Sequence, residues 1–307
     1  MSRFQLIEII PGLSLVPAEN NGRFPFAHSF LVEGAANALI DTGCGMSAVD
    51  ELKREGKIDF IIASHSHPDH TALDWKFDGA PIYAPEYAAD TFGNFDTLGD
   101  RLTEPGALAG EWRAYVRTAM NYKTALPSQT FADGRVFDFG AISLVAIHTP
   151  GHTIDHTCFF EPTHGVLLSF DIDLTSFGPW YGHRESDIDE FEESIRKVIA
   201  LKPRVIVSSH KGIIADDLDL RLRRYLNVFN ARDRILLDLM SRARSLDELV
   251  AFSPFYQNYP YAEVLLRYWE SQMIRKHLAR LIDHGQVTEV EDGKFVRRSA
   301  DIESTCR

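Results

Sequence analysis

The chain has 307 residues, of which 45% are hydrophobic and 25% charged, and its formal net charge at pH 7 is −12. This is the composition of an ordinary globular protein, so it excludes disordered, collagen-like and coiled-coil chains. The negative charge disfavours a protein that mainly binds nucleic acid. The three cysteines, Cys44, Cys158 and Cys306, lack the spacing of a disulfide framework or a cysteine-rich zinc module. Because no secretion signal or membrane-spanning apolar run is visible either, we expect a cytoplasmic protein without membrane contact.

The first part of the chain predicts a sheet with helical connections. Residues 4–43 contain four short apolar stretches separated by turn residues, which is typical of two hairpins. Residues 47–56 predict a helix with Ser47 as its N-cap, and the continuous apolar stretch at 57–64 predicts a buried strand. Residues 90–128 have an irregular helical pattern, which we interpret as an insertion into the fold.

Strands resume after residue 131, and a helix over about 187–200 leads into a last apolar strand that ends near residue 210. The chain then changes character. Two helical segments, a capping-box spacing from Ser245 to Glu248 and a hairpin signal at residues 292–293 are typical of a winged-helix domain. We therefore predict a catalytic domain over residues 1–215 and a small winged-helix-like domain over 216–307.

The charge of the second domain bears on its role. Residues 217–307 hold 15 basic and 14 acidic side chains, whereas the first 216 residues hold 17 and 30. Winged helices often bind DNA, but DNA binding requires a basic surface. A nearly neutral winged helix therefore favours packing or the formation of a homodimer.

The most informative pattern is HSHPDH at residues 65–70, directly after a predicted buried strand. Side chains alternate along a strand, so His65 and His67 point the same way, and the following turn can bring Asp69 and His70 to a second position. Imidazole and carboxylate groups are ligands of zinc. In a solvated turn, three histidines and an aspartate so close together would have no partner that stabilises them. The pattern therefore predicts a metal site.

Three further candidate ligands, His152, Asp171 and His210, each follow an apolar strand. Loops at one edge of a sheet can converge on one cleft. Taken singly, the two histidines could equally be hydrogen-bonded residues at a sheet edge, and the aspartate could cap a helix. Combined with the HSHPDH pattern, the three predict a single metal centre.

These motifs resemble the metallo-β-lactamase superfamily. The pattern of that family is H-x-H-x-D-H, then Gly-His, then an aspartate and a last histidine that each follow an apolar strand. This chain has HSHPDH at 65–70, PGHT at 150–153, FD at 170–171 and SSHKG at 208–212, in the same order. The resemblance covers roughly residues 5–215 and implies an α/β fold, a four-layer αββα sandwich with two divalent metal ions at the strand ends.

The resemblance also implies roles for individual residues. One ion would be bound by His65, His67 and His152, the other by Asp69, His70 and His210, with Asp171 between them. Asp41 would orient one of the ligands, although this residue also fits a simple turn. Zinc is the expected metal, with iron and manganese as alternatives, because metal availability decides among them.

This site predicts hydrolysis by a water molecule that bridges two cations and is ionised at neutral pH, with Asp69 as its hydrogen-bond acceptor. The expected substrate is an ester, thioester or lactone of a small metabolite. The alternative is a nuclease or phosphodiesterase that acts on RNA or DNA and uses the C-terminal domain as a binding platform, which the negative charge disfavours. β-Lactam hydrolysis is disfavoured by the lack of a secretion signal.

Candidates for a substrate pocket are Trp180, Tyr181, His183 and His156. Tyr181 or His183 could donate a hydrogen bond to an oxyanion, or the three residues at 180–183 could simply pack the fold. His156 could contact substrate or be a buried core histidine. Phe24 and Phe26, in the first predicted hairpin, could form a flap over the site.

Overall fold

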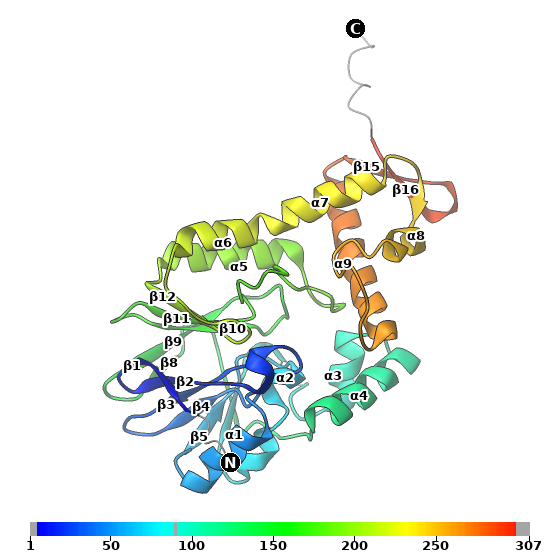
Figure 1. Ribbon diagram of the computed structural model, residues 1–307. Helices are drawn as coiled ribbons and strands as arrows, with labels where there is room; N and C mark the ends of the chain where they lie inside the picture. The colour runs from blue at the N-terminus through cyan, green and yellow to red at the C-terminus, as the bar shows by residue number, and fades with distance from the viewer. Residues whose placement is uncertain (1–4, 89–90, 299–307) are drawn as a thin grey trace. The chain divides into compact units, whose positions relative to one another are not determined.

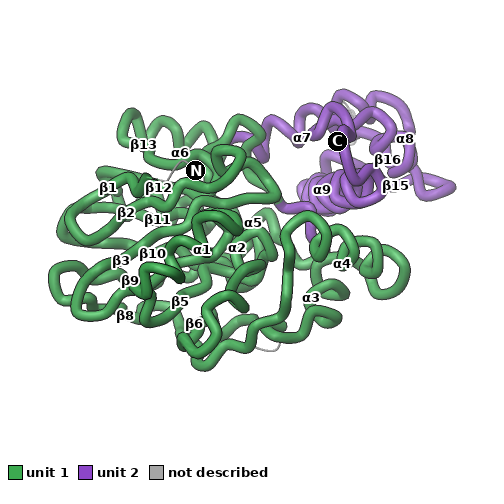
Figure 2. Tube along the Cα trace, turned by 60° about the horizontal axis from the view of Figure 1, so that its bottom comes forward, with its two compact units in different colours: residues 1–180, 184–226 green, residues 181–183, 227–307 purple. Residues whose placement is uncertain are grey.

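The computed structural model describes residues 5–88 and 91–298, which form two compact units (Figure 2). The larger comprises Met1–Trp180 and Arg184–Leu226, and the smaller comprises Tyr181–His183 and Asn227–Arg307. The division after Leu226 falls later than the predicted boundary at residue 215. The reason is that helix α6 (Leu218–Leu226) packs against α5 (Ile188–Leu201) of the larger unit.

The first sheet of the larger unit has seven strands in sequence order (Figure 1). They are β1 (Ile7–Ile10), β2 (Leu13–Val16), β3 (Ser29–Val32), β4 (Ala38–Ile40), β5 (Phe60–Ile62), β6 (Ile82–Pro85) and β7 (Gln129–Phe131). Strands β1 to β4 pair antiparallel, as the predicted hairpins require. Strands β4 to β7 pair parallel, because helical segments connect them.

The second sheet has six strands in the order β13-β12-β11-β10-β9-β8. They are β8 (Val136–Asp138), β9 (Ser143–His148), β10 (Thr157–Glu161), β11 (Val166–Phe170), β12 (Val205–Ser208) and β13 (Gly212–Ile214). Strands β11 and β12 run parallel and are connected through α5, and the other neighbours are antiparallel. The apolar stretches predicted to be strands thus form two separate sheets.

The hydrophobic core of the larger unit lies between these two sheets. Phe30 of the first sheet and Phe170 of the second meet edge to face, with ring centroids 5.5 Å apart, and Phe159 packs against Phe170 at 5.8 Å. All three side chains are fully buried, and burying each contributes about 1.5–3 kcal/mol. With α1 outside one sheet and α5 and α6 outside the other, the predicted four-layer α/β sandwich is confirmed (Figure 1).

The other helical segments of the larger unit are α1 (Met46–Glu55), α2 (Pro68–Thr71), α3 (Phe95–Leu102), α4 (Ala107–Met120), η1 (Glu19–Gly22), η2 (Asp74–Phe77) and η3 (Glu86–Ala88). Helices α3 and α4 lie in the predicted insertion between β6 and β7. Helix α1 begins after Gly45, so the prediction of Ser47 as its N-cap is wrong. The backbone of Gly45, with φ of +101°, makes the turn into the helix two residues earlier than a cap at Ser47 would.

The smaller unit contains α7 (Val228–Leu239), α8 (Leu246–Ala251), α9 (Glu263–Asp283) and a sheet of β14 (Arg244–Ser245), β16 (Lys294–Arg297) and β15 (Val287–Val290), with η4 (Glu291–Gly293) in the hairpin. The capping box from Ser245 to Glu248 is confirmed at the start of α8. The predicted order of elements, helices followed by a hairpin, is present. The identification of this unit as a winged helix stays a prediction.

The cysteines and the helices each bear on the expected class of protein. Cys44 and Cys158 are fully buried, and burial raises the pKa of each thiol to about 12, so both stay protonated and unreactive at neutral pH. Cys306 lies outside the described residues. Within residues 5–88 and 91–298, no helix has the length and apolar character needed to cross a membrane.

Gly151 allows the loop before His152 to pass close to α5. Its φ is +119°, and a Cβ atom at this position would lie 2.2 Å from the backbone nitrogen of Phe191. We predict that Gly151→Ala lowers the free energy of unfolding in urea by about 1–3 kcal/mol through overpacking, in addition to the backbone strain. Gly134→Ala is the matched control, because φ is also positive there but no described atom lies within 4 Å. An equal loss in both variants would contradict the steric argument.

Candidate metal centre

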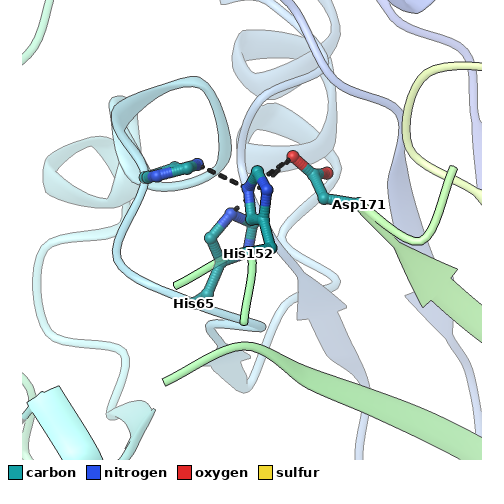
Figure 3. Close-up of side chains that lie close together, drawn as sticks. His65, His152 and Asp171 are labelled. Atoms are coloured by element: carbon teal, nitrogen blue, oxygen red, sulfur yellow. Dashed lines mark hydrogen bonds and ion pairs between the residues drawn. The ribbon is translucent and has the colours of Figure 1, made fainter. Parts of the chain in front are cut away.

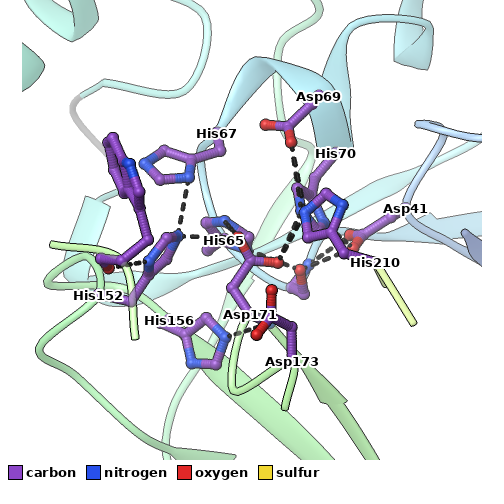
Figure 4. A network of polar contacts seen from close by, with 12 residues as sticks. Asp41, His65, His67, Asp69, His70, His152, His156, Asp171, Asp173 and His210 are labelled. Atoms are coloured by element: carbon purple, nitrogen blue, oxygen red, sulfur yellow. Dashed lines mark hydrogen bonds and ion pairs between the residues drawn. The ribbon is translucent and has the colours of Figure 1, made fainter. Parts of the chain in front are cut away.

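The ends of strands from both sheets carry the predicted metal-binding side chains (Figure 4). Strand β5 leads into the loop with His65 and His67, and Pro68 starts the short helix α2 that carries Asp69 and His70. In the second sheet, the segments that follow β9, β11 and β12 carry His152, Asp171 and His210. The structure therefore brings all seven predicted ligands to one edge of the sandwich.

These seven side chains form two groups that could each hold a metal ion. The first group is His65, His67, His152 and Asp171, and the second is Asp69, His70 and His210. Within each group the possible ligand atoms lie within 4.8 Å of one another. Imidazole nitrogens and carboxylate oxygens are the donors that divalent zinc, iron and manganese accept.

Asp171 lies between the two groups, and its two oxygens face different neighbours. Oδ2 is 3.0 Å from Nε2 of His152, while Oδ1 is 3.1 Å from Nε2 of His70 and 3.4 Å from Nε2 of His210. Figure 3 shows His65 and His152 beside this carboxylate. A single side chain therefore contacts ligands of both groups.

Several buried polar atoms of the centre have no hydrogen-bond partner among the described residues. These atoms are Nε2 of His65, Nε2 of His70 and Oδ1 of Asp171, of which the last two lie 3.1 Å apart as an ion pair without forming a hydrogen bond. Leaving such an atom buried and unpaired costs about 1–3 kcal/mol. A cation placed among them would satisfy all three, so the residues present fit a metal centre.

The imidazoles are held in place by hydrogen bonds at their outer nitrogens. Nδ1 of each of four rings faces an oxygen: His65 with Oγ of Ser64 at 2.9 Å, His70 with Oδ2 of Asp41 at 2.7 Å, His152 with the carbonyl of Trp180 at 2.8 Å, and His210 with the carbonyl of Gly22 at 2.7 Å. This arrangement leaves Nε2 of each ring directed at the centre. His67 instead turns Nδ1 inward, 2.9 Å from Nε2 of His152.

Asp41 is fully buried at the end of β4 and adopts φ of +59°. Besides its contact with His70, its Oδ1 accepts from the backbone N–H of Ser64 and its Oδ2 accepts from the hydroxyl of Ser64, both at 2.7 Å. The carboxylate thus links the first turn after β5 to a candidate ligand on α2. This is the arrangement expected of a residue that orients a ligand.

The electrostatic environment of the centre favours positive charge. Burial lowers the pKa of His70, but the carboxylates of Asp171, Asp41 and Asp69 outweigh it, so the net shift is well upward. Burial also lowers the pKa of His65, and there the neighbouring His70 adds to the effect. The carboxylates therefore attract a proton to His70 in the same pocket that a divalent cation would fill.

His156 is fully buried directly behind Asp171. Its Nε2 accepts a hydrogen bond from the backbone N–H of Asp171 at 3.2 Å, and its Nδ1 faces Thr149. Burial, together with His152, lowers the pKa of His156 to about 3, so the ring stays neutral and can accept this bond. His156 is thus buried beside the centre, and its contact with substrate stays a prediction.

The three candidates at residues 180–183 lie in different surroundings. Trp180 flanks the centre, with its ring centroid 6.0 Å from that of His67. Tyr181 is fully buried in the smaller unit, where its hydroxyl is bonded to His277 at 2.7 Å and accepts from Arg232 at 2.8 Å. The carbonyl of His183 accepts from Lys276, also in the smaller unit. A role for these residues in a substrate pocket stays a prediction.

Sequence reasoning missed a support beneath Asp171. The hydroxyl of Tyr225, on α6, donates to the carbonyl of Asp171 at 3.2 Å and contacts Oδ1 of Asp173 at 3.0 Å. Tyr225 shares the buried face of α6 with Leu222, so the only signal in the sequence is a polar tip on an apolar helix face. Such a tip needs a partner when it is buried.

Arg101, on α3, connects the insertion to the ligand loops. Its Nε lies 2.7 Å from Glu185, its guanidinium donates to Ser66, which separates two ligands, and the carboxylate of Asp155 lies 3.8 Å away. Burial raises the pKa of Glu185 to about 7, although Arg101 opposes this shift. The insertion is therefore part of the structure that holds the centre.

Comparison with known proteins identifies the family. The sequence profile described as "Metallo-beta-lactamase superfamily" matches residues 22–210. The human protein named acyl-coenzyme A thioesterase MBLAC2 is 28% identical over 205 residues, which cover 59% of this chain and 70% of that protein. The atrochrysone carboxyl ACP thioesterase of Aspergillus fumigatus is 25% identical over 221 residues, 69% of this chain and 58% of that protein.

Some relatives are considerably longer than the matched region. The lactamase-like protein nscB of Arthroderma benhamiae is 24% identical over 220 residues, and this chain spans only 41% of its length. Among solved structures, a metallo-beta-lactamase family protein from Thermus thermophilus matches with a TM-score of 0.73 and 25% identity, over 95% of this chain and 100% of that one. A beta-lactamase domain protein from Burkholderia ambifaria matches with a TM-score of 0.70 and 16% identity, over 95% and 93%.

The donor groups and the family together indicate that the protein binds divalent metal. With a family profile that matches well over half of the sequence and a fold shared with solved members, the chain belongs to the metallo-β-lactamase superfamily.

Proposed function

We propose that the protein is a metal-dependent hydrolase that cleaves thioesters of small metabolites. The observation that carries this proposal is the pair of buried donor groups joined by Asp171. Two relatives named as thioesterases favour a thioester over the other substrates expected from the sequence, and over a phosphodiester of RNA or DNA. The protein needs no serine or cysteine nucleophile for this reaction, and both described cysteines are buried and protonated.

The proposed centre holds two divalent ions. His65, His67 and His152 would bind one, Asp69, His70 and His210 the other, and Asp171 would contact both. Zinc is the expected metal, with iron or manganese as alternatives that depend on supply. Asp41 would orient His70, and the carbonyl of Trp180 would orient His152.

When bound, the ions supply a Lewis acid for the scissile carbonyl and a water molecule with a lowered pKa. The protein's own part is to position groups and move a proton. The carboxylate of Asp69 lies 3.9 Å from Nε2 of His70 and 3.6 Å from Nε2 of His210, at the edge of the second donor group, where it would accept the proton of the attacking water. Asp69 would then return that proton to the sulfur as the carbon–sulfur bond breaks, which yields a free thiol and a carboxylic acid, and the acid releases its remaining proton to solvent as it ionises. Trp180 would lie beside the bound substrate at the first donor group, since its ring centroid is 6.0 Å from that of His67.

We further propose that the protein works in the cytoplasm and that its C-terminal unit mediates packing or a homodimer. The nearly equal numbers of basic and acidic residues after position 216 support this over nucleic-acid binding. Light scattering of the full-length chain tests the oligomeric state.

Removing ligands should remove metal and turnover together. We predict that Asp171→Ala loses both ions, because its carboxylate faces both groups, and that His67→Ala loses at least the ion of its own group. Thioester hydrolysis should fall by at least about 10³-fold in both variants. Metal content is measured by mass spectrometry and thiol release by a colorimetric assay. His164→Ala is the control, since this ring is 45% exposed and contacts Glu161. A variant without metal that kept full turnover would refute the proposal.

Weakening the hold on His70 should lower metal affinity without removing a ligand. In Asp41→Asn, one carboxylate oxygen becomes an N–H₂ group, which cannot accept from both His70 and Ser64. We expect a loss of metal affinity of about 10- to 100-fold, measured by competition with a chromophoric chelator. Asp59→Asn is the matched control, because Asp59 is an exposed residue that accepts only a bond from the backbone of Asn37 among the contacts described. Equal affinities in the two variants would show that Asp41 has no such role.

A further inference from the structure

A small, largely apolar cavity lies beside Asp69 in the larger unit. Its volume is about 70 Å³, and its apolar lining includes Pro25, Phe26, Met46, Leu73, Ala119 and Met120. These side chains come from the loop between β2 and β3, the start of α1, the turn after α2 and the end of α4. The cavity thus joins the metal centre to the insertion, which the hydrolytic mechanism does not otherwise use.

The loop and the insertion meet at this cavity. The ring of Phe24 stacks on that of Tyr115 of α4, with centroids 6.2 Å apart and planes inclined by 15°. Helix α4 also packs against α2, which carries Asp69. Phe26 lines the cavity two residues after Phe24, so one of the two residues that the sequence suggested as a flap forms part of the cavity wall.

Three polar residues of the lining have their polar groups in water or in hydrogen bonds with other residues. Glu19 and Asn121 are exposed, so their polar ends can remain in water. The hydroxyl of Thr42 is buried and donates to Asp74 at 2.8 Å. A ligand inside the cavity would therefore contact mainly apolar side chains, with the predicted metal ligand Asp69 among the lining residues.

We propose that this cavity binds the acyl chain of the substrate and selects short chains. The inference rests on the proposed thioester hydrolysis. The thiol arm of a coenzyme A or carrier-protein thioester is rich in amides and hydroxyls, and inside this cavity several of them would lie against apolar side chains, at a cost in free energy. An alkyl chain loses nothing there and gains from burial. Because a cavity of about 150 Å³ holds benzene, one of 70 Å³ fits a chain of roughly three or four carbons.

Filling the cavity tests the proposal. Ala119→Phe places a ring in it, whereas Ala114→Phe adds the same ring to an exposed position of the same helix. For metal-loaded protein we expect kcat/KM for butyryl-coenzyme A to fall at least tenfold in Ala119→Phe and to change less than twofold in Ala114→Phe. Met120→Ala enlarges the cavity and should shift the preference toward hexanoyl and octanoyl chains. Metal content and melting temperature confirm that each variant is folded and loaded.

A second pair of substrates distinguishes binding of the acyl chain from binding of the thiol arm. Ala119→Phe should lower kcat/KM by the same factor for butyryl-coenzyme A and for butyryl-N-acetylcysteamine, because both carry the same acyl chain. A loss seen only with coenzyme A would assign the cavity to the thiol arm and overturn the proposal. An unchanged chain-length profile in both Ala119→Phe and Met120→Ala would also overturn it.

Failure of the proposed function has a different outcome. In that case the metal-loaded wild type hydrolyses no thioester of any chain length. The cavity is then tested by binding of butyrate, observed by saturation-transfer NMR. Binding that weakens in Ala119→Phe but not in Ala114→Phe supports an acyl site even so, and equal binding in both variants refutes it.

Discussion

Burying polar atoms without hydrogen bonds costs free energy, and this protein buries three such atoms in one small volume, on His65, His70 and Asp171. The surrounding hydrogen bonds make the cost unavoidable, because they hold the outer nitrogens and leave the inner atoms facing one another. Metal binding relieves this cost in the folded state alone, since the unfolded chain has no such arrangement. The buried polar atoms of the centre therefore lower the free energy of unfolding of the metal-free protein, and bound metal restores it.

The backbone contributes to the same arrangement. Asp41 adopts φ of +59°, and Phe170, directly before Asp171, adopts φ of +46°. A non-glycine residue in this region costs about 1–3 kcal/mol and persists where packing holds it. Both strained residues end a buried strand and direct a carboxylate at the imidazoles. Packing in the core between the two sheets thus stabilises the strained backbone that positions these acidic side chains.

The sequence predicted the elements that carry the ligands, because apolar strands followed directly by histidine or aspartate are local patterns, and the sandwich was implied by the resemblance to the metallo-β-lactamase superfamily. Supports that act through distant contacts were not predictable. Tyr225 reaches the carbonyl of Asp171 from 54 positions away, and the carbonyl of Trp180 holds His152 through a group that every residue has. His156 was visible as a histidine, but only the packing of β10 against the end of β11 decides that its Nε2 faces a backbone amide. Local chemistry can be predicted from residues, whereas its orientation depends on the completed fold.

The two helices of the insertion, α3 and α4, contact different parts of the site. Arg101 of α3 contacts Glu185 and Ser66, so changes there act on the loops that carry ligands. The end of α4, around Met120, instead lines the cavity beside Asp69 with apolar side chains. Substitutions near Met120 can therefore alter which acyl chain fits while the ligands stay in place, whereas α3 is constrained by its ion pair. If relatives differ in substrate, the physical expectation is that they differ first at the end of α4 and in the loop that packs on it.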